Sequence, residues 1–340
     1  MRIQQKLGKA LPLATLLENP TIRRLALAVR RQDSSRSRSA LVTIQGGGSK
    51  PPLFCVHCGT GSVFHFYELA RYLGPDQPVY GLQPLGMGGG RGFDRSVPAM
   101  AARYVPEVLR VQPHGPYLLC GLSFGGIVAF EMAQRLRQQG CQAIFVGLLD
   151  TSLPWLGSAG SVAAKTRRHW ENLSKLGMCR RLAYLGRVAW DNFRTLVVRS
   201  WLHARRLPDL SKTLRCQLAL ALGHPLPLSL EDFYYYHSIC VPSRSAYVPQ
   251  VFPGRVTLFR AREGRMASLE PTDLSWSRFA GEGLTVVDMP GGHRDMLKEP
   301  AVQLLAEKLK ACLEATCNSH SCSEKCCLAC ARSSAEQGSV

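Results

Sequence analysis

The sequence predicts an α/β fold with a mostly parallel central sheet and helices on both faces. From Leu53 onward, short apolar runs alternate with longer runs of helical periodicity, a rhythm typical of βαβ units. The chain has 340 residues, of which 46% are hydrophobic, so it can bury a large core. We therefore expect one domain of about 250 residues with additional segments at its ends.

The alternation can be followed along the chain before it breaks. Strand-like runs occupy residues 53–57, 78–82, 117–122 and 143–149. Helical runs occupy residues 64–73, 97–111 and 125–139. Residues 160–240 have no convincing strand, and helix-length segments follow one another there at 161–176, 180–203, 211–222 and 231–240. Strands return at 255–260 and 284–288, before a closing helix at about 300–315.

The two ends differ in composition from the predicted domain. Residues 11–31 have helical periodicity with a restart at Asn19-Pro20, where Asn suits the N-cap and Pro the first helical position. Serine and arginine alternate over residues 32–40, as in a polar linker. From residue 316 the chain is rich in cysteine and serine and lacks an amphipathic period. We therefore expect residues 316–340 to be a disordered tail.

Charge and hydropathy limit the location and partners of the chain. The net charge of +18 is concentrated in residues 1–40 and 151–215, which carry +7 and +10. A basic face fits an anionic partner, although a solvated arginine-rich surface is the simpler interpretation. No apolar run is long enough to cross a bilayer, and the N-terminus lacks the apolar core of a signal peptide. We expect a cytoplasmic protein that binds neither nucleic acid nor membranes.

The thirteen cysteines fall into two groups. Seven are scattered through the predicted domain, and those inside apolar strands, such as Cys55 and Cys120, are expected to be small buried hydrophobic residues. The other six crowd the C-terminal end: Cys312, Cys317, Cys322, Cys326, Cys327 and Cys330. Together with His320 this end offers zinc ligands, but a single CxxC is a weak signal, and we expect no metal.

The segment Gly121-Leu122-Ser123-Phe124-Gly125-Gly126 lies between a strand-like run and a helical run. A serine flanked by glycines at a strand-to-helix turn is the nucleophile elbow of α/β-hydrolases. The turn forces strained backbone angles, and side chains at Gly121 and Gly125 would collide with neighbouring segments. Ser123 is therefore the predicted nucleophile, and the helical insertion, at about residues 155–245, is the predicted lid of such a fold.

A serine nucleophile needs a base, and the base needs a carboxylate that fixes its tautomer. Asp150 ends the apolar run 143–149, at the edge of a parallel sheet where ligands bind. A helix-capping aspartate is the alternative. Among nine histidines, His293 combines a late position, a glycine-rich turn and a place after the last strand. We predict Asp150 as the acid and His293 as the base, the alternative being a surface histidine.

An oxyanion hole requires two backbone N–H donors. The first is expected from Phe124, which follows the nucleophile, and the second from the loop after the first predicted strand. In that loop we favour Gly59, with Thr60 or Gly61 as near alternatives. His57, at the start of the loop, either orders it or is a structural histidine with satisfied hydrogen bonds.

With these residues placed, the chain resembles the type I thioesterase domains that terminate nonribosomal peptide and polyketide synthases. The likeness covers about residues 41–315. It rests on Pro51–His57 with Gly59-Thr60-Gly61, the elbow, Leu148-Leu149-Asp150, Tyr247-Val248-Pro249, Phe252–Val256, and Pro290-Gly291-x-His293-x-x-Met296 ending in Glu299-Pro300. This resemblance implies a domain over 51–315 with an α/β-hydrolase fold and no cofactor of its own.

The resemblance also implies a reaction and its partners. An acyl or peptidyl chain carried as a phosphopantetheine thioester would transfer to Ser123, with His293 as base and then acid and Asp150 holding the imidazolium. Water or an internal nucleophile would then release the chain as an acid or a macrocycle. The partner would be an acyl or peptidyl carrier protein or the upstream modules of a synthase. Such carriers are acidic where they dock, so they would suit the arginines of the lid: Arg167, Arg168, Arg180, Arg181, Arg205 and Arg206.

A second resemblance precedes the first. Residues 11–22 look like the final helices of a carrier domain, but no Gly-Gly-x-Ser-type phosphopantetheine motif lies before Leu11. We therefore expect residues 1–31 to be a carrier remnant and residues 32–50 a linker. A stand-alone editing thioesterase and a carboxylesterase of soluble esters are the alternatives of the same fold. A docking module without catalysis is the alternative of another class, and the Ser123, Asp150 and His293 set argues against it.

Overall fold

The computed structural model describes residues 21–31, 39–87, 92–141, 144–153, 207–224, 226–263 and 272–336. The chain divides into two compact units, Met1–Leu153 with Pro225–Val340, and Pro154–His224. The larger unit contains the sheet. In the smaller unit the described part is one helix, α9 (Leu207–Ala221), with the turn after it.

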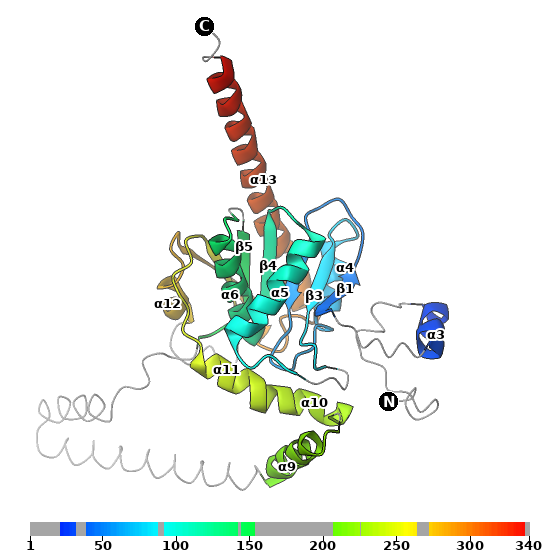
Figure 1. Cartoon of the computed structure of the whole chain (residues 1–340). Coiled ribbons are helices and arrows are strands. Elements are labelled where there is room, and N and C mark those ends of the chain that lie inside the picture. The colour runs from blue at the N-terminus through cyan, green and yellow to red at the C-terminus, as the bar shows by residue number, and fades with distance from the viewer. Residues whose placement is uncertain are drawn as a thin grey trace, which may run out of the picture. The chain divides into compact units, whose positions relative to one another are not determined.

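The described part of the larger unit is built on a seven-stranded sheet (Figure 1). Its strands are β1 (Leu41–Gln45), β2 (Leu53–Val56), β3 (Val79–Leu82), β4 (Tyr117–Leu122), β5 (Ile144–Leu149), β6 (Val256–Glu263) and β7 (Leu284–Gly292). Their order across the sheet is β1-β3-β2-β4-β5-β6-β7. β1 pairs antiparallel with β3, and every other pair is parallel. This confirms the predicted mostly parallel sheet.

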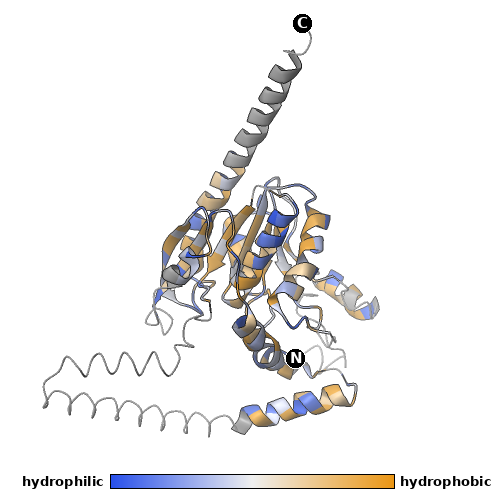
Figure 2. Cartoon of the chain, turned by 60° about the vertical axis from the view of Figure 1, so that its left-hand side comes forward, coloured by the Kyte–Doolittle hydropathy of each residue, from blue (hydrophilic) through white to orange (hydrophobic). Residues whose placement is uncertain are grey.

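Two pairs of helices cover the two faces of the sheet (Figure 1). The helix α5 (Val97–Val111) packs on α6 (Phe124–Gln138), whereas α4 (Phe66–Leu73) packs on α13 (Ala301–Glu336). The strands β2, β4 and β5 consist mainly of hydrophobic residues (Figure 2), as expected for parallel strands covered on both faces. The loops that follow the carboxyl ends of these strands contain the predicted site residues Gly59, Ser123 and Asp150.

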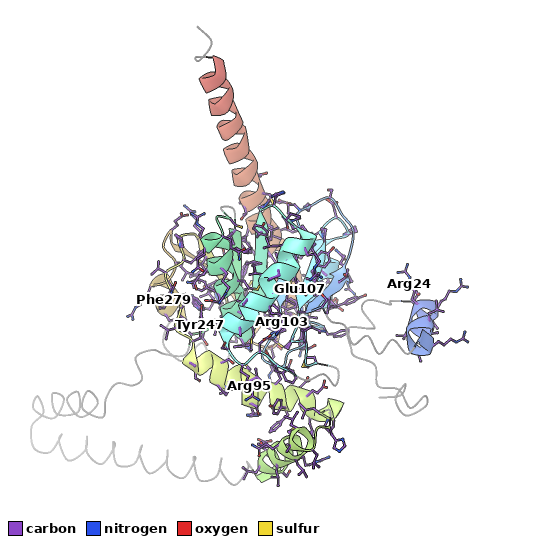
Figure 3. The ribbon with its side chains drawn as sticks, viewed as in Figure 1. Arg24, Arg95, Arg103, Glu107, Tyr247 and Phe279 are labelled. Atoms are coloured by element: carbon purple, nitrogen blue, oxygen red, sulfur yellow. The ribbon has the colours of Figure 1, made fainter. Side chains whose placement is uncertain are left out.

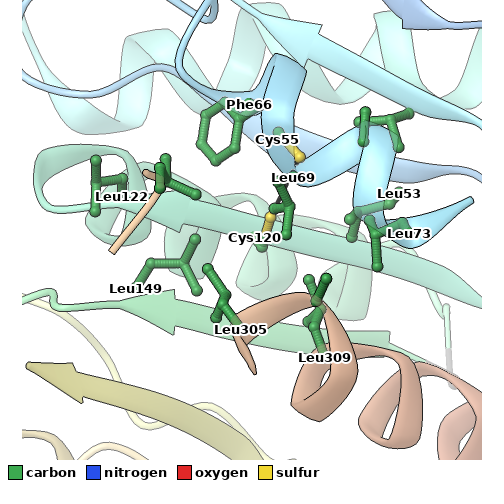
Figure 4. Packing of buried hydrophobic residues seen from close by; sticks show 14 of the residues in the cluster. Leu53, Cys55, Phe66, Leu69, Leu73, Cys120, Leu122, Leu149, Leu305 and Leu309 are labelled. Carbon is green, nitrogen blue, oxygen red and sulfur yellow. Dashed lines mark hydrogen bonds between the residues drawn. The ribbon is translucent and has the colours of Figure 1, made fainter. Parts of the chain in front are cut away.

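A hydrophobic cluster fills the space between the sheet and the α4–α13 pair (Figure 4). Cys55 and Cys120 lie in it as partners across β2 and β4, with 3.4 Å between their sulfur atoms and no exposed surface. Burial raises the pKa of the Cys55 thiol well above its usual value. This confirms that both cysteines are small buried hydrophobic residues.

The structure also departs from the predicted elements. β1 lies inside residues 32–50, which were predicted to be a linker, and α12 (Thr272–Ser277) was not predicted at all. In β1 the side chains of Val42 and Ile44 are buried while Thr43 between them is exposed, so a short half-buried strand was mistaken for a linker. At the C-terminus α13 continues to Glu336, where we predicted a disordered tail. No glycine or proline interrupts residues 301–336 to end the helix.

The predicted helices at 211–222 and 231–240 correspond to α9 and to a consecutive helical segment in the larger unit. This return segment consists of α10 (Leu228–Tyr234), a π-helical turn η1 (Tyr235–Cys240) and α11 (Val241–Ala246). The predicted helices at 161–176 and 180–203 lie outside the described residues. So does the restart at Asn19-Pro20, whereas α3 (Ile22–Arg31) is helical as expected.

Side chains fix the return segment to the rest of the larger unit (Figure 3). The Ser243 hydroxyl donates to the carbonyl of Arg95, just before α5, at 2.8 Å. The hydroxyl of Tyr247, which directly follows α11, donates to Glu131 of α6 at 3.0 Å. No helix within the described residues is long and apolar enough to cross a membrane.

Candidate active site

The turn from β4 into α6 holds Ser123 in a strained conformation. Its φ is +57° and its ψ is −116°, which a residue with a side chain rarely adopts. A Cβ at Gly121 would lie 2.2 Å from the carbonyl carbon of Gly125, and one at Gly125 would lie 2.3 Å from the carbonyl oxygen of His57. The two glycines therefore let the elbow close on itself and on the end of β2. The Ser123 N–H donates to the Leu149 carbonyl at 2.8 Å, which ties the elbow to β5.

The structure brings Asp150 and His293 together. Oδ2 of Asp150 accepts a hydrogen bond from Nδ1 of His293 at 2.6 Å, and Oδ1 accepts one from the backbone N–H of Ala261 at 3.1 Å. Asp150 is buried, while a third of the His293 side chain is exposed. The carboxylate therefore fixes the imidazole with its proton on Nδ1, which leaves Nε2 as the atom that can accept a proton.

The backbone around both residues explains how they meet. Asp150 follows β5 with a φ of +40°, and its N–H donates to the Phe259 carbonyl of β6 at 2.7 Å. β7 is longer than predicted and ends at Gly292, so His293 follows the strand directly. The turn after it closes on Asp295, whose N–H donates to the Gly292 carbonyl at 3.0 Å. Because β5, β6 and β7 are neighbours in the sheet, their ends deliver the acid and the base side by side.

The loop after β2, residues 57–61, is the predicted source of the second oxyanion donor. Its Gly61 N–H donates to the Cys58 carbonyl at 3.0 Å, so that donor is already engaged. Burial by itself raises the pKa of the Cys58 thiol, but hydrogen bonds from His65 and from the hydroxyl and backbone N–H of Thr60 outweigh it, so the pKa is lowered. The Thr60 N–H therefore faces this sulfur. The geometry leaves the Gly59 N–H as the candidate donor of the loop.

The second candidate donor, the Phe124 N–H, belongs to the first residue of α6. The first N–H groups of a helix have no acceptor within the helix, and the helix dipole makes this end favourable for negative charge. An oxyanion that develops beside Ser123 would be stabilised by these N–H groups and by the helix dipole. The role of Phe124 as an oxyanion donor stays a prediction.

His57 is a structural histidine with both ring nitrogens engaged. Its side chain has no exposed surface, Nδ1 lies 2.8 Å from the Cys58 carbonyl oxygen, and Nε2 lies 3.3 Å from the Tyr235 hydroxyl. Burial lowers the pKa of His57 to about 4, so the ring is neutral near pH 7. Of the two interpretations left open by the sequence, the satisfied histidine fits, and its contact with the Cys58 carbonyl also orders the loop.

Sequence reasoning missed two aromatic side chains beside the site. Tyr235 reaches His57 from the return segment, and Trp276 of α12 donates its indole N–H to the carbonyl of Thr151, next to Asp150, at 2.8 Å. Both are fully buried. The run Phe233-Tyr234-Tyr235-Tyr236 was visible in the sequence as an unusual aromatic cluster, but nothing in it indicated its partner.

No group of three or more metal-ligating side chains occurs within the part of the chain that the structure describes. The side chains of the last tail cysteines, from Cys322 onward, lie outside that part. The expectation that the tail binds no metal therefore stays a prediction.

Comparison with known proteins finds similarity to thioesterase domains and to synthetases. The family model for thioesterase domains matches residues 51–195. The chain is 45% identical over 152 residues to malpinin synthetase of Mortierella alpina, an alignment covering 44% of this chain and 2% of that protein. It is 28% identical over 318 residues to a probable non-canonical nonribosomal peptide synthetase of Salinispora arenicola (strain CNS-205), covering 92% of this chain and 4% of that protein. The chain thus spans a small fraction of the length of these relatives.

A solved structure shares the fold. The thioesterase domain of NocB, from the nocardicin cluster, superposes with a TM-score of 0.52 at 20% sequence identity, over 81% of this chain and 99% of that one. The mostly parallel sheet, the elbow after β4 and the helices on both faces are thus those of an α/β-hydrolase fold.

Proposed function

We propose that this chain, whose residues 51–195 match the family model for thioesterase domains, releases a carrier-bound acyl or peptidyl chain through an acyl-enzyme on Ser123. The observation that carries the proposal is the 2.6 Å contact between Asp150 and His293, which accompanies a serine in the strained conformation of an elbow. If His293 were only a surface histidine, or Asp150 only a helix cap, neither would need to contact the other beside a strained serine.

The first half-reaction forms the acyl-enzyme. Nε2 of His293 takes the proton from Oγ of Ser123 as this oxygen attacks the thioester carbonyl carbon. The carbonyl oxygen becomes an oxyanion that the N–H groups of Phe124 and Gly59 stabilise. When the carbon–sulfur bond breaks, His293 returns the proton to the departing thiol. The buried Asp150 carboxylate stabilises the imidazolium that exists between these two transfers.

The second half-reaction releases the chain. Water, or a hydroxyl or amine of the acyl chain itself, loses a proton to Nε2 of His293 and attacks the ester carbonyl. The bond to Ser123 then breaks, and the serine oxygen regains the proton. The product is a linear acid in the first case and a macrolactone or macrolactam in the second.

The substrate and partner are proposed from the relatives. The two relatives named above are synthetases, one of them a probable nonribosomal peptide synthetase, so we place this chain at the release step of a comparable assembly. The phosphopantetheine arm belongs in that case to the substrate, carried by a carrier protein or an upstream module. We further propose that residues 1–31 derive from a carrier domain. The lid arginines that would attract an acidic carrier lie outside the described residues.

Covalent labelling tests the proposal. A fluorophosphonate should modify Ser123, detected by mass spectrometry of the Ser123 peptide, and His293→Ala should abolish the labelling. His114→Ala is the matched control, because His114 is exposed in the loop between α5 and β4. Labelling that survives in His293→Ala, or that occurs on another residue, contradicts the proposal. A labelled enzyme that turns over p-nitrophenyl esters but no carrier-bound thioester would be an esterase instead.

A further inference from the structure

The π-helical turn η1 contacts the loop that follows β2. Tyr235, at the start of η1, is fully buried, and its ring packs edge-to-face on the ring of His57 at 5.3 Å between centroids. The Tyr235 hydroxyl lies 3.3 Å from Nε2 of His57. The two residues are 178 positions apart in the sequence, so this contact joins the return segment to the predicted oxyanion loop. π-helical turns occur frequently at functional sites.

The protonation of His57 defines the direction of these hydrogen bonds. Nδ1 faces the Cys58 carbonyl oxygen, which can only accept, so Nδ1 carries the proton. Burial keeps the ring neutral near pH 7, so Nε2 carries a lone pair and accepts the proton of the Tyr235 hydroxyl. The sulfur of Met100 is the other neighbour of this hydroxyl, at 3.6 Å, and it is both more distant and a weaker acceptor. Tyr235 therefore holds the tautomer in which His57 donates to Cys58.

The hydrogen bond to Cys58 orients the Gly59 N–H. The Cys58 carbonyl and the Gly59 N–H belong to one planar peptide group, and in a trans peptide they point in opposite directions. Two donors, Nδ1 of His57 at 2.8 Å and the Gly61 N–H at 3.0 Å, hold the carbonyl on one side. The N–H is thereby directed to the other side. Rotation of this peptide would remove the candidate donor without moving any side chain of the catalytic residues.

The remaining surroundings allow the loop little freedom. A Cβ at Gly59 would lie 3.2 Å from the ring of Tyr236 and 3.4 Å from the sulfur of Cys240, both in η1. On the other side, the His57 N–H donates to the Leu82 carbonyl at 3.0 Å, and the His57 carbonyl lies against Gly125 of the elbow. The return segment therefore packs on the Gly59 backbone directly as well as through His57.

We propose that Tyr235 is a positioning residue for the oxyanion hole, which it orients through His57 and the Cys58–Gly59 peptide. The inference rests on the proposed function, because it assigns the Gly59 N–H to the oxyanion. Its consequence is that a residue of the return segment, with no contact to the reacting atoms, acts on turnover and leaves substrate binding unchanged. The oxyanion exists in the transition state and in the tetrahedral intermediate but not in the bound thioester.

The test compares two Tyr→Phe variants. Tyr235→Phe removes the hydroxyl that donates to His57. Tyr104→Phe is the matched control, because the Tyr104 ring also packs edge-to-face on His57, at 6.0 Å, while its buried hydroxyl has no hydrogen-bond partner among the described residues. We expect Tyr235→Phe to lower kcat for a small acyl thioester about fivefold to tenfold, which is what loss of one hydrogen bond gives. KM should be unchanged, and Tyr104→Phe should change neither constant.

A double-mutant cycle tests whether Tyr235 acts on the Cys58–Gly59 peptide through His57. The side chain of His57→Asn keeps an amide N–H near the Cys58 carbonyl, but it is too short to place an acceptor where Nε2 of His57 meets the Tyr235 hydroxyl. In that background, Tyr235→Phe should change kcat less than twofold. Active-site titration with a fluorophosphonate counts competent enzyme, so that partial unfolding does not lower the measured kcat.

Three results would overturn the inference: a Tyr235→Phe enzyme with kcat within twofold of wild type, an equal loss in Tyr104→Phe, or an undiminished loss in the His57→Asn background. Failure of the proposed function has a different signature, because the wild-type enzyme would then neither label at Ser123 nor hydrolyse the thioester.

Discussion

Replacing Gly125 by alanine tests whether close approach of the backbone, rather than helix propensity, selects glycine in the elbow. Gly125 lies in the first turn of α6, where alanine is the better helix former by about 1 kcal/mol. Propensity alone therefore predicts a more stable variant. The closeness of the backbone at the end of β2 predicts a less stable variant instead.

The size of the conflict follows from the distances. The new Cβ would lie 2.3 Å from the His57 carbonyl oxygen and 2.5 Å from that of Val56, whereas real Cβ contacts essentially never fall under 3.0 Å. The gap to His57 must therefore widen by about 0.7 Å, from 2.3 Å to 3.0 Å. Both atoms belong to the backbone, so no rotamer change relieves the contact. Overpacking of this kind costs about 1 to 3 kcal/mol.

The shift separates the two parts that we propose to act on the oxyanion, the elbow and the loop after β2. Because misplacement by about 1 Å can lower turnover about 10²-fold, we expect Gly125→Ala to lose about that factor in kcat while still folding. Thioester hydrolysis, thermal unfolding and fluorophosphonate labelling would be measured on the same preparation. Gly46→Ala is the control, since the nearest atom to its new Cβ is Cγ2 of the exposed Thr43 side chain, at 3.3 Å, and among the described residues no backbone atom beyond its two chain neighbours lies within 4 Å. A folded Gly125→Ala enzyme with kcat within threefold of wild type would refute this reasoning.

Two further predictions concern the acid and the buried histidine. Asp150→Asn keeps an acceptor for the Ala261 N–H but presents an amide N–H to Nδ1 of His293, which moves the imidazole proton to Nε2. We expect a folded protein whose kcat is lowered about 10⁴-fold. A loss of less than tenfold in steady-state hydrolysis would argue against the triad. For His57, the pKa of the imidazole is 6.5 in the unfolded chain and about 4 in the folded protein, where burial lowers it. The unfolded chain therefore binds a proton more readily, so the stability that neutral His57 allows is fully present above pH 6.5 and is lost as the pH falls toward 4. Between pH 8 and pH 5 the wild type should lose about 2 kcal/mol more unfolding free energy than His57→Asn, measured by urea denaturation, and equal losses would show that His57 does not titrate in this way.

What the sequence predicted well depends on local physics. Gly121 and Gly125 flank Ser123 within five positions, and the strain they relieve is a property of that turn. The parallel strands are short apolar runs with distinct boundaries, so their identity was visible from composition and spacing. The choice of Asp150 and His293 depended on their places after strands, and the structure brings these two side chains together.

What the sequence did not predict depends on contacts between distant segments. β1 has five residues, and its pairing with β3 decides that it is a strand rather than part of a linker. In the sequence, Tyr235 cannot be distinguished from any other aromatic residue of a helix, because its partner His57 is 178 positions away. His57 itself was ambiguous because a histidine's protonation depends on burial, which a single sequence does not give.

The proposed acid, base and nucleophile, Asp150, His293 and Ser123, all belong to the larger compact unit, and the smaller unit, residues 154–224, contains none of them. The chain leaves the larger unit four residues after β5 and rejoins it before α10, so the strand ends that bring Asp150 and His293 together belong to the larger unit alone. A change in the length of the insertion therefore adds or removes residues outside the unit that contains the proposed catalytic residues. In such an arrangement, the inserted unit and the unit with the proposed catalytic residues can evolve as separable parts of one chain.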